Sequence, residues 1–331
     1  MKFSLIICTY CRAASLFRLL ESLQKQILYP DEIIIIDGSK DEATELMLQM
    51  QRFKNLQYFK VQENNRGLTR QRNIGLQKTD SNSEIICFLD DDIVLKPKYF
   101  DKLINTFSEY PDALGVGGAI INADVWKTRL ENKKTEFGNY YYKDWVRKLG
   151  SRNILRKRLG LLSNRPPGMM PTFSNGFSIG FYPPTGEIHK VEYFMGGVSA
   201  YRKGLFEKIK FSEYFQGYGL YEDMDFCLRA SKTGQLYLNT GAQVFHLHEE
   251  SGRPDDFKYG KMVVENGWIV WKTKNPNPDI QSIIKWNLIT LLLATIRIKN
   301  ALLDNEKGAF KDALGRFIAW INLGFFKPPC Y

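Results

Sequence analysis

Three adjacent aspartates, Asp90, Asp91 and Asp92, are the strongest chemical signal in this chain. They follow the apolar run Glu84–Leu89, which has the length and composition of a buried strand. Like charges this close repel one another and are costly unless a cation neutralises them. Carboxylate oxygens suit Mg²⁺ or Mn²⁺, so the run predicts a divalent-cation site. A solvated acidic turn is the alternative.

A second acidic group, Glu222 and Asp223, opens an expected helix and follows the glycine-rich loop Gly217-Tyr218-Gly219. A carboxylate held on such a loop beside a cation site can act as a general base. Acidic residues in a first helical turn also favour the helix dipole, so a helix cap is an equal alternative.

Two of the three histidines, His246 and His248, end a short apolar run. One of them is expected to be a metal ligand, and at least one a hydrogen-bonded structural histidine. The helix expected over Leu68–Lys78 carries Arg70 and Arg72 in its first turns, where arginines can approach a diphosphate. A solvated helix face is the alternative for these two arginines.

Cys8 and Cys11 have the spacing of a redox pair. Spacing without context is weak, so we expect Cys8 to be a core residue and Cys11 a small residue at a helix start. Five cysteines in 331 residues are too few for a secreted disulfide scaffold. The first twelve residues have no small-residue cleavage site, so we expect a first strand and a cytoplasmic protein.

The elements that must position these side chains alternate over the first 120 residues. Expected strands are Phe3–Cys8, Glu32–Ile36, Leu56–Val61 and Glu84–Leu89, and expected helices are Arg12–Gln26, Asp41–Arg52, Leu68–Lys78 and Pro97 to about Glu109. This alternation predicts an α/β fold, Rossmann-like, whose mostly parallel sheet has helices on both faces. Ligands bind at the carboxyl ends of such strands, where Thr9-Tyr10, Asp37 and Asp90–Asp92 fall.

The net charge of +10 is concentrated in one segment. Residues 127–165 carry twelve Lys or Arg and three Asp or Glu, so this segment alone accounts for +9. A single basic segment suggests a local anionic partner, such as a membrane surface or a phosphorylated acceptor, rather than nucleic acid. The longest uncharged apolar stretch near the C-terminus, Asn287–Ile296, is about half of the ~20 residues that a spanning helix needs.

Six segments occur in a characteristic order across about residues 1–250: SLIICTYCR, EIIIIDGSKDEAT, ENNRGLTRQRNIGL, FLDDDIVL, MGGVSAYRKGLF and YEDMDFCLR. Together they resemble the inverting GT-A-fold glycosyltransferases of family 2. The resemblance implies a nucleoside-diphosphate sugar as donor, linked to UDP or dTDP, and Mn²⁺ or Mg²⁺ as cofactor. It also implies transfer of one sugar to a hydroxyl of a glycan or lipid-linked acceptor.

The resemblance also implies roles for individual residues. Asp223 matches the catalytic base and Glu222 its acceptor-side neighbour, and Asp92 and His246 match the metal ligands. The implied nucleotide-sugar site consists of Thr9, Tyr10 and Arg12 near the nucleobase, Asp37 in contact with it, Arg72 near the nucleotide, Asp90 and Asp91 at the ribose and diphosphate, and Gly196 and Gly197 beside the donor sugar and acceptor.

Two features depart from the family pattern. A single aspartate precedes Gly38-Ser39 where many relatives have two, and the Gln-x-x-Arg-Trp signature of processive synthases does not follow Asp223. The second departure, with no spanning helix expected, favours adding one sugar or a few. A sugar-nucleotide pyrophosphorylase would instead carry a glycine-rich phosphate loop after the first strand. A non-catalytic adaptor for a membrane or another anionic ligand would need neither acidic group.

We expect three segments: 1–123 as the nucleotide-sugar half, 124–260 as the basic insert with the acceptor half of the same GT-A domain, and 261–331 as a helical extension. The extension has amphipathic stretches at Ile283–Ile298 and Phe310–Ile321. With the basic segment, they could hold the protein on the inner face of the cell membrane as a peripheral protein. Simple packing of these helices on the rest of the chain is an equal alternative.

Overall fold

The computed structural model describes the chain except for residues 122–124, 129–134, 248–253 and 326–331. Its contacts divide the chain into two compact units. Unit 1 comprises Met1–Asn122 and Pro184–Arg253, and unit 2 comprises Ala123–Pro183 and Pro254–Tyr331. The first break lies next to the boundary expected at 123. The segment expected as one piece, 124–260, is shared between the units: its basic part groups with the C-terminal helices, and residues 184–253 group with the first 122 residues.

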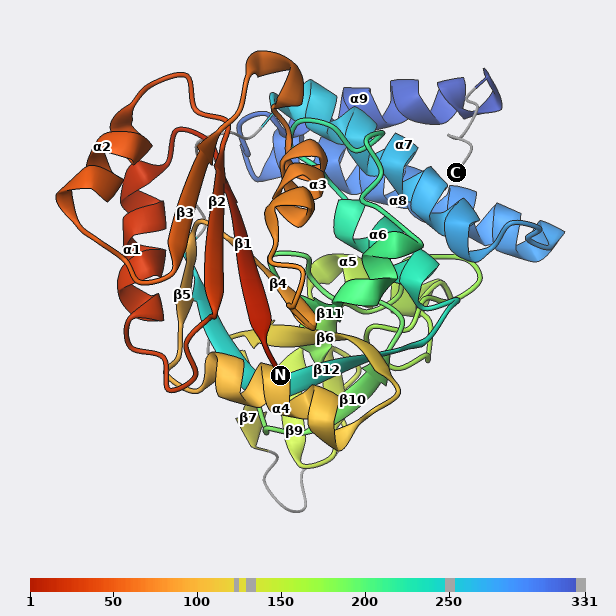
Figure 1. Ribbon diagram of the computed structural model, residues 1–331. Coiled ribbons are helices and arrows are strands. Elements are labelled where there is room, and N and C mark those ends of the chain that lie inside the picture. The colour runs from red at the N-terminus through yellow and green to blue at the C-terminus, as the bar shows by residue number, and fades with distance from the viewer. Residues whose placement is uncertain (122–124, 129–134, 248–253, 326–331) are drawn as a thin grey trace. The chain divides into compact units, whose positions relative to one another are not determined.

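Unit 1 is built on one nine-stranded sheet in the order β10-β12-β6-β11-β4-β1-β2-β3, with β5 paired to β12 (Figure 1). The β1–β2, β2–β3, β1–β4 and β6–β12 pairs are parallel, whereas β11 runs antiparallel between β4 and β6. The α/β class is confirmed, with antiparallel strands added. The strands are β1 (Phe3–Thr9), β2 (Glu32–Asp37), β3 (Leu56–Lys60), β4 (Ile85–Asp90), β5 (Ile93–Leu95), β6 (Ala113–Ile120), β10 (Ile188–Val191), β11 (Val198–Arg202) and β12 (Gln235–His246).

Helices cover both faces of this sheet, and Figure 1 shows α1 and α3 on opposite sides of β1–β3. The leucines of α1 recur at helical spacing and pack with α4 into the main core, against Leu5 and Ile7 of β1. On the other face, a Cβ at Gly75 of α3 would lie 2.6 Å from Ile6, so a glycine allows the close approach. The helices of unit 1 are α1 (Ala13–Leu23), α2 (Ala43–Met50), α3 (Leu68–Lys78), α4 (Tyr99–Glu109) and α6 (Glu222–Ala230).

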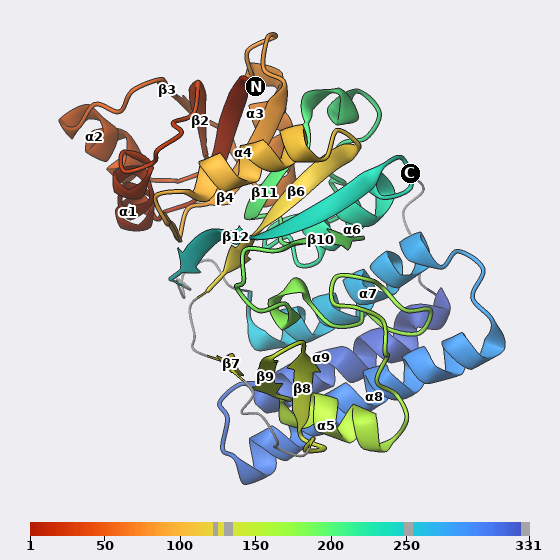
Figure 2. The same ribbon diagram turned by 90° about the horizontal axis from the view of Figure 1, so that it is seen from below.

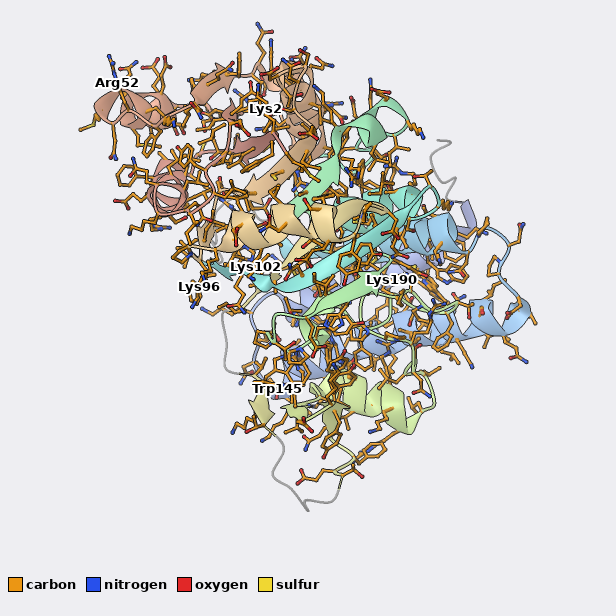
Figure 3. All side chains as sticks on the ribbon, turned by 60° about the horizontal axis from the view of Figure 1, so that its bottom comes forward. Lys2, Arg52, Lys96, Lys102, Trp145 and Lys190 are labelled. Atoms are coloured by element: carbon orange, nitrogen blue, oxygen red, sulfur yellow. The ribbon has the colours of Figure 1, made fainter. Side chains whose placement is uncertain are left out.

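The described residues of unit 2 combine a small antiparallel sheet, in the order β7-β9-β8, with four α-helices. Figure 2 shows this unit. Trp145, labelled in Figure 3, begins the central strand of this sheet. Glycines let α7 and α9 pack closely, because a Cβ at Gly260 or Gly315 would meet the backbone of the other helix. The elements of unit 2 are β7 (Lys127–Thr128), β8 (Asn139–Tyr142), β9 (Trp145–Lys148), α5 (Ser151–Arg158), α7 (Asp256–Lys274), α8 (Ile280–Leu303) and α9 (Ala309–Asn322).

The sequence analysis expected no helix near the C-terminus that is long enough to span a membrane, and the structure changes this expectation. Among the described residues, one helix, α8, is long and apolar enough to cross a membrane by length and composition alone, and 17% of its most apolar window is buried. The sequence analysis counted only the uncharged stretch. Lys285 and Arg297 lie far enough apart for an 18-residue window to contain few charges.

Candidate functional site

The carboxyl ends of β1, β2 and β4 lie together because their register is parallel. Thr9 pairs with Asp37 across β1–β2, and Cys8 pairs with Asp90 across β1–β4. The buried amide of Gln71 on α3 connects the first two ends, since its Nε2 donates to the carbonyls of Thr9 (3.2 Å) and Ile36 (2.8 Å). The sequence analysis missed Gln71. A polar side chain on the sheet-facing side of α3 was the available signal.

Asp91 is buried and held by two partners from the first strand and helix. The hydroxyl of Thr9 donates to its Oδ2 at 2.7 Å, and Nη1 of Arg12 donates to its Oδ1 at 3.1 Å. Burial raises the pKa of Asp91 to about 6, although the hydrogen bonds from Thr9 and Arg12 act in the opposite direction. The structure therefore brings together three residues that the sequence assigned to the nucleotide site.

Asp92 faces His246, and the resemblance gave these two residues as metal ligands. The Nε2 of His246 lies 3.0 Å from Oδ1 of Asp92, and Nη1 of Arg12 lies 3.6 Å from Oδ2. The β5–β12 pairing creates this approach, because Ile93 pairs with His246 and the N–H of Leu247 donates to the carbonyl of Asp92. Burial lowers the pKa of His246, but the hydrogen bond and charge of Asp92 outweigh it and hold the pKa above its usual value. The other candidate, His248, lies outside the described residues.

Arg72 is the centre of a buried charge network rather than a solvated helix residue. Its side chain is 2% exposed, and its guanidinium lies 5.6 Å and 5.3 Å from the ring centroids of Phe88 and Phe211. Nη1 donates to Oε1 of Glu222 at 2.5 Å, and Nη2 donates to Oδ1 of Asp90 at 3.2 Å. Arg72 thus links the end of β4 to the start of α6. The two aromatic rings were not anticipated from the sequence.

Glu222 begins α6 and is almost fully buried. Its Oε1 accepts from Arg72, and its buried Oε2 has no hydrogen-bond partner among the described residues. Burial raises the pKa of Glu222 to about 8, against the lowering effect of the Arg72 charge. A buried carboxyl oxygen without a partner is a place where an acceptor or donor hydroxyl could bind.

Asp223 is half-buried beside Glu222. Its Oδ2 accepts from the N–H of Gly196 at 3.2 Å, and its Oδ1 accepts from the N–H of Met224 at 2.7 Å. Burial raises the pKa of Asp223, and these two N–H groups oppose that effect. The result is a carboxylate that is fixed in direction and more basic than an exposed one.

Gly196 and Gly197 fit between these carboxylates because they have no side chains. A Cβ at Gly196 would lie 2.8 Å from both Nη1 of Arg72 and Oε1 of Glu222, and a Cβ at Gly197 would overlap the carboxylate of Asp90. The N–H of Asp90 also donates to the carbonyl of Gly197 at 3.1 Å. The two glycines therefore place backbone where any side chain would displace the acidic groups.

Three further residues named in the sequence analysis are Asp37, Tyr10 and Cys8. Asp37 is fully buried, and its carboxylate already accepts from the N–H of Ser39 (2.7 Å) and the hydroxyl of Tyr58 (2.9 Å). These two hydrogen bonds hold the loop after β2, and contact of Asp37 with a nucleobase stays a prediction. Tyr10 is 40% exposed at the end of β1. Burial raises the pKa of the Cys8 thiol to about 12, which disfavours the thiolate that redox chemistry requires.

Asp92 and His246 carry donor atoms that suit a divalent cation. The described residues contain no group of three or more His, Cys, Asp or Glu that could hold a metal ion. Asp92 and His246 nevertheless place a carboxylate oxygen and an imidazole nitrogen 3.0 Å apart, and both groups are suitable ligands for Mn²⁺. This pair fits a cation whose remaining ligands come from the substrate or from water.

A comparison with known families decides the class of the protein. The family model described as glycosyl transferase family 2 matches residues 4–177, just over half of the chain. The chain belongs to glycosyltransferase family 2. This match excludes the sugar-nucleotide pyrophosphorylase and the non-catalytic adaptor as alternatives. The resemblance found in the sequence motifs is therefore confirmed.

Curated relatives support the same family over shorter ranges. A glucosyl-dolichyl phosphate glucuronosyltransferase of Haloferax volcanii is 27% identical over 124 residues, which are 37% of this chain and 39% of that protein. The O-antigen chain rhamnosyltransferase RfbN of Salmonella typhimurium is 37% identical over 97 residues, 29% of each protein. The chain thus spans about two fifths or less of the length of these two relatives.

Solved structures show the fold. TarS 1–349 of S. aureus in complex with UDP-GlcNAc is 16% identical with a TM-score of 0.53, covering 97% of this chain and 79% of that one. The mannosyltransferase PcManGT of Pyrobaculum calidifontis in complex with GDP-Man and Mn²⁺ is 13% identical with a TM-score of 0.56, covering 98% and 87%. The family 2 chain described here accordingly has the GT-A fold.

Proposed function

We propose that this protein is a metal-dependent inverting glycosyltransferase. It transfers one sugar from a nucleoside-diphosphate sugar, linked to UDP or dTDP, to a hydroxyl of a glycan or lipid-linked acceptor. Family membership supports the reaction class, and the complexes of the structural neighbours with UDP-GlcNAc and GDP-Man support a nucleotide-sugar donor. The observation that carries the proposal is the Gly196-Gly197 backbone, which lies between Asp90 on one side and Glu222 and Asp223 on the other.

In this mechanism the chain's own residues bind the donor and take a proton. Asp90, Asp91, Thr9 and Arg12 line the ends of β1 and β4, where a nucleoside diphosphate would bind. Asp92 and His246 would hold Mn²⁺ or Mg²⁺, which would offset the charge of the departing diphosphate. PcManGT, a neighbour in fold, was solved with Mn²⁺.

Asp223 is the proposed general base. Its two backbone hydrogen bonds fix its direction, and its raised pKa makes it a better proton acceptor than an exposed aspartate. As the acceptor hydroxyl attacks the anomeric carbon directly, Asp223 takes the hydroxyl proton. This single displacement inverts the configuration of the transferred sugar.

Replacement of the base tests the mechanism. Asp223→Asn keeps the shape and one of the two backbone hydrogen bonds, because its amide nitrogen cannot accept from an N–H. It cannot take a proton, so transfer should fall by about two orders of magnitude or more. Binding of UDP with Mn²⁺, measured by calorimetry, should stay close to that of the wild type. The assay is nucleoside-diphosphate release in a donor screen with glycan and lipid-linked acceptors.

The matched control is Asp225→Asn. Asp225 lies in the same helical turn, but its carboxylate pairs with Arg229 at 2.7 Å. If Asp223 served only the helix dipole, both variants would behave alike and turnover would change little. Near-normal turnover in Asp223→Asn would remove Asp223 from the mechanism.

We also propose that the protein is cytoplasmic and that unit 2 binds the inner face of an anionic membrane as a peripheral protein. On α8, Ile280, Ile284 and Leu288 follow one another at four-residue spacing and are 50–68% exposed. On α9, Phe310 and Leu314 are also exposed. Exposed apolar stripes on basic helices are typical of helices that lie in a membrane interface.

Vesicle co-sedimentation tests this location. Ile284→Asp with Leu288→Asp should reduce binding to vesicles containing phosphatidylglycerol, because the apolar face of α8 would lose its burial. The matched control is Leu159→Asp, which changes another exposed leucine of unit 2 (54% exposed). The membrane location would be rejected if vesicle binding does not depend on anionic lipid, does not weaken at high salt and is unchanged by the α8 substitutions.

A further inference from the structure

Unit 2 contains a long stretch without carboxylates. Residues 145–183 contain seven Lys or Arg and no Asp or Glu. Four of the seven, Arg152, Arg156, Lys157 and Arg158, lie on the helix α5. Positive charge in this stretch therefore has no acidic side chain of its own segment to pair with.

Arg156 is the member of this group that the fold buries. It is 8% exposed, whereas Arg152 and Arg158 are exposed. Its Nε and Nη2 are both buried, and neither has a hydrogen-bond partner among the described residues. Burial, followed by the charge of Arg152 one turn earlier, lowers the pKa of Arg156 to about 10.

The buried Arg72 of unit 1 provides a comparison, because its guanidinium is paired with carboxylates. Arg72 has two carboxylates within 3.2 Å and two aromatic rings near its guanidinium. By contrast, Nε and Nη2 of Arg156 have no hydrogen-bond partner among the described residues, and the positive charge of Arg152 acts unfavourably on its guanidinium. A buried guanidinium without a counter-charge is costly, so the fold keeps a strong anion-binding group unsatisfied.

The surrounding helix fixes the position of this side chain. Asn153 and Arg156 form the buried side of α5. The helix ends at Arg158, the nearby Gly160 has a φ of +65°, and the N–H of Leu161 donates to the carbonyl of Arg156 at 2.8 Å. The next residue, Lys157, is already engaged, because its Nζ donates to the carbonyl of Phe137.

We propose that Arg156, assisted by Arg152, binds a phosphate group. Nε and Nη2 lie on one edge of a guanidinium and point in parallel, which matches two oxygens of a phosphate. The nearby positive charge of Arg152 favours a doubly charged anion over a single carboxylate. A free phosphate and a lipid headgroup share this chemistry. The site depends neither on the proposed donor nor on Asp223.

Thermal unfolding and calorimetry of the full chain with inorganic phosphate, at constant ionic strength and with EDTA, test the proposal. Wild-type protein should bind phosphate and unfold at a higher temperature in its presence. Arg156→Met should bind phosphate at least about tenfold more weakly. Without phosphate, this variant should unfold at the same or a higher temperature than the wild type, because it no longer buries an unpaired charge.

Arg158→Met is the matched control, since it removes an exposed arginine from the same helix. It should retain phosphate binding, and UDP binding with Mn²⁺ should be unchanged in both variants. A parallel series with vesicles of phosphatidylcholine, with and without phosphatidic acid, identifies the source. Binding of inorganic phosphate supports a soluble ligand, and binding only to phosphatidic acid supports a headgroup. If neither binds the wild type, or if Arg156→Met and Arg158→Met lose binding equally, the proposal is wrong.

Discussion

Replacing Arg72, the buried arginine of the candidate site, should lower the free energy of unfolding of unit 1. The loss should be larger than for any exposed charged residue. In Arg72→Met, Glu222 loses the guanidinium that lies 2.5 Å from its Oε1, and Asp90 loses a partner at 3.2 Å. At a pH where Glu222 is ionised, breaking this buried pair by removing one partner costs about 3–5 kcal/mol, because a buried charge is left uncompensated. The methionine side chain can still pack between Phe88 and Phe211, so most of the loss is electrostatic.

The loss in unfolding free energy caused by Arg72→Met should increase as the pH rises. Burial already raises the pKa of Glu222 to about 8, and Arg72 opposes that rise, so the pKa of Glu222 should be higher still in the variant. A carboxyl whose pKa is raised by folding stabilises the protein below its unfolded pKa and loses that contribution as the pH rises through the folded pKa. The variant should therefore lose more stability at pH 9 than at pH 6, where Glu222 is protonated in both proteins.

Urea unfolding followed by far-ultraviolet circular dichroism at the two pH values measures this effect. All six tryptophans lie in unit 2, so tryptophan fluorescence reports separately on the unit that the substitution leaves unchanged. The double variant Arg72→Met with Glu222→Gln removes both charges. It should be more stable than the sum of the two single changes predicts, by about 1–3 kcal/mol.

A surface pair on the same helix provides the control. Arg70 lies 3.2 Å from Glu213, but the two side chains are 30% and 59% exposed. Arg70→Met should cost no more than about 1 kcal/mol. A similar cost for Arg72→Met and Arg70→Met, or additive effects of Arg72→Met and Glu222→Gln, would refute the view that Arg72 neutralises Glu222.

Two further predictions concern the metal pair and the glycines. Asp92→Ala should abolish the dependence of UDP binding on Mn²⁺ and His246→Ala should weaken it, because the two residues supply the facing ligand atoms. Calorimetry with and without Mn²⁺ measures this dependence. Unchanged metal dependence in both variants contradicts the assignment. Gly197→Ala should weaken UDP binding at least about tenfold, because its methyl group overlaps Asp90. The control Gly204→Ala adds a methyl group in open space and should bind UDP normally. Equal UDP binding by both variants would contradict the packing argument.

The parts of the fold that the sequence predicted are those with a continuous apolar pattern. The strand expected over Glu32–Ile36 is β2, in which Ile33–Ile36 are all fully buried between two helical layers. The helix expected over Leu68–Lys78 matches α3 at both ends. Elements buried on both faces leave a strong signal in the sequence because almost every residue must be apolar.

The strand β6 was missed because its sequence, ALGVGGAI, contains three glycines that lower its strand propensity. The structure shows why they are there. A Cβ at Gly115 would lie 2.6 Å from Tyr201, and one at Gly117 would lie 2.5 Å from Phe194. Large aromatic rings from later segments occupy the space, so the reason for these glycines lies about 80 residues away in the chain.

The neutralisation of the three aspartates shows what a sequence motif can and cannot predict. The argument from like charges required positive partners, and the structure supplies them from distant positions: Arg72 for Asp90, Arg12 for Asp91, and His246 for Asp92. Spacing along the chain does not show that these partners lie beside the aspartates. β12, which carries His246, and α3, which carries Arg72, come close to them only once the sheet has formed. The proposed cation site therefore depends on the facing Asp92 and His246 rather than on the number of adjacent carboxylates, since Asp90 and Asp91 are already paired with arginines.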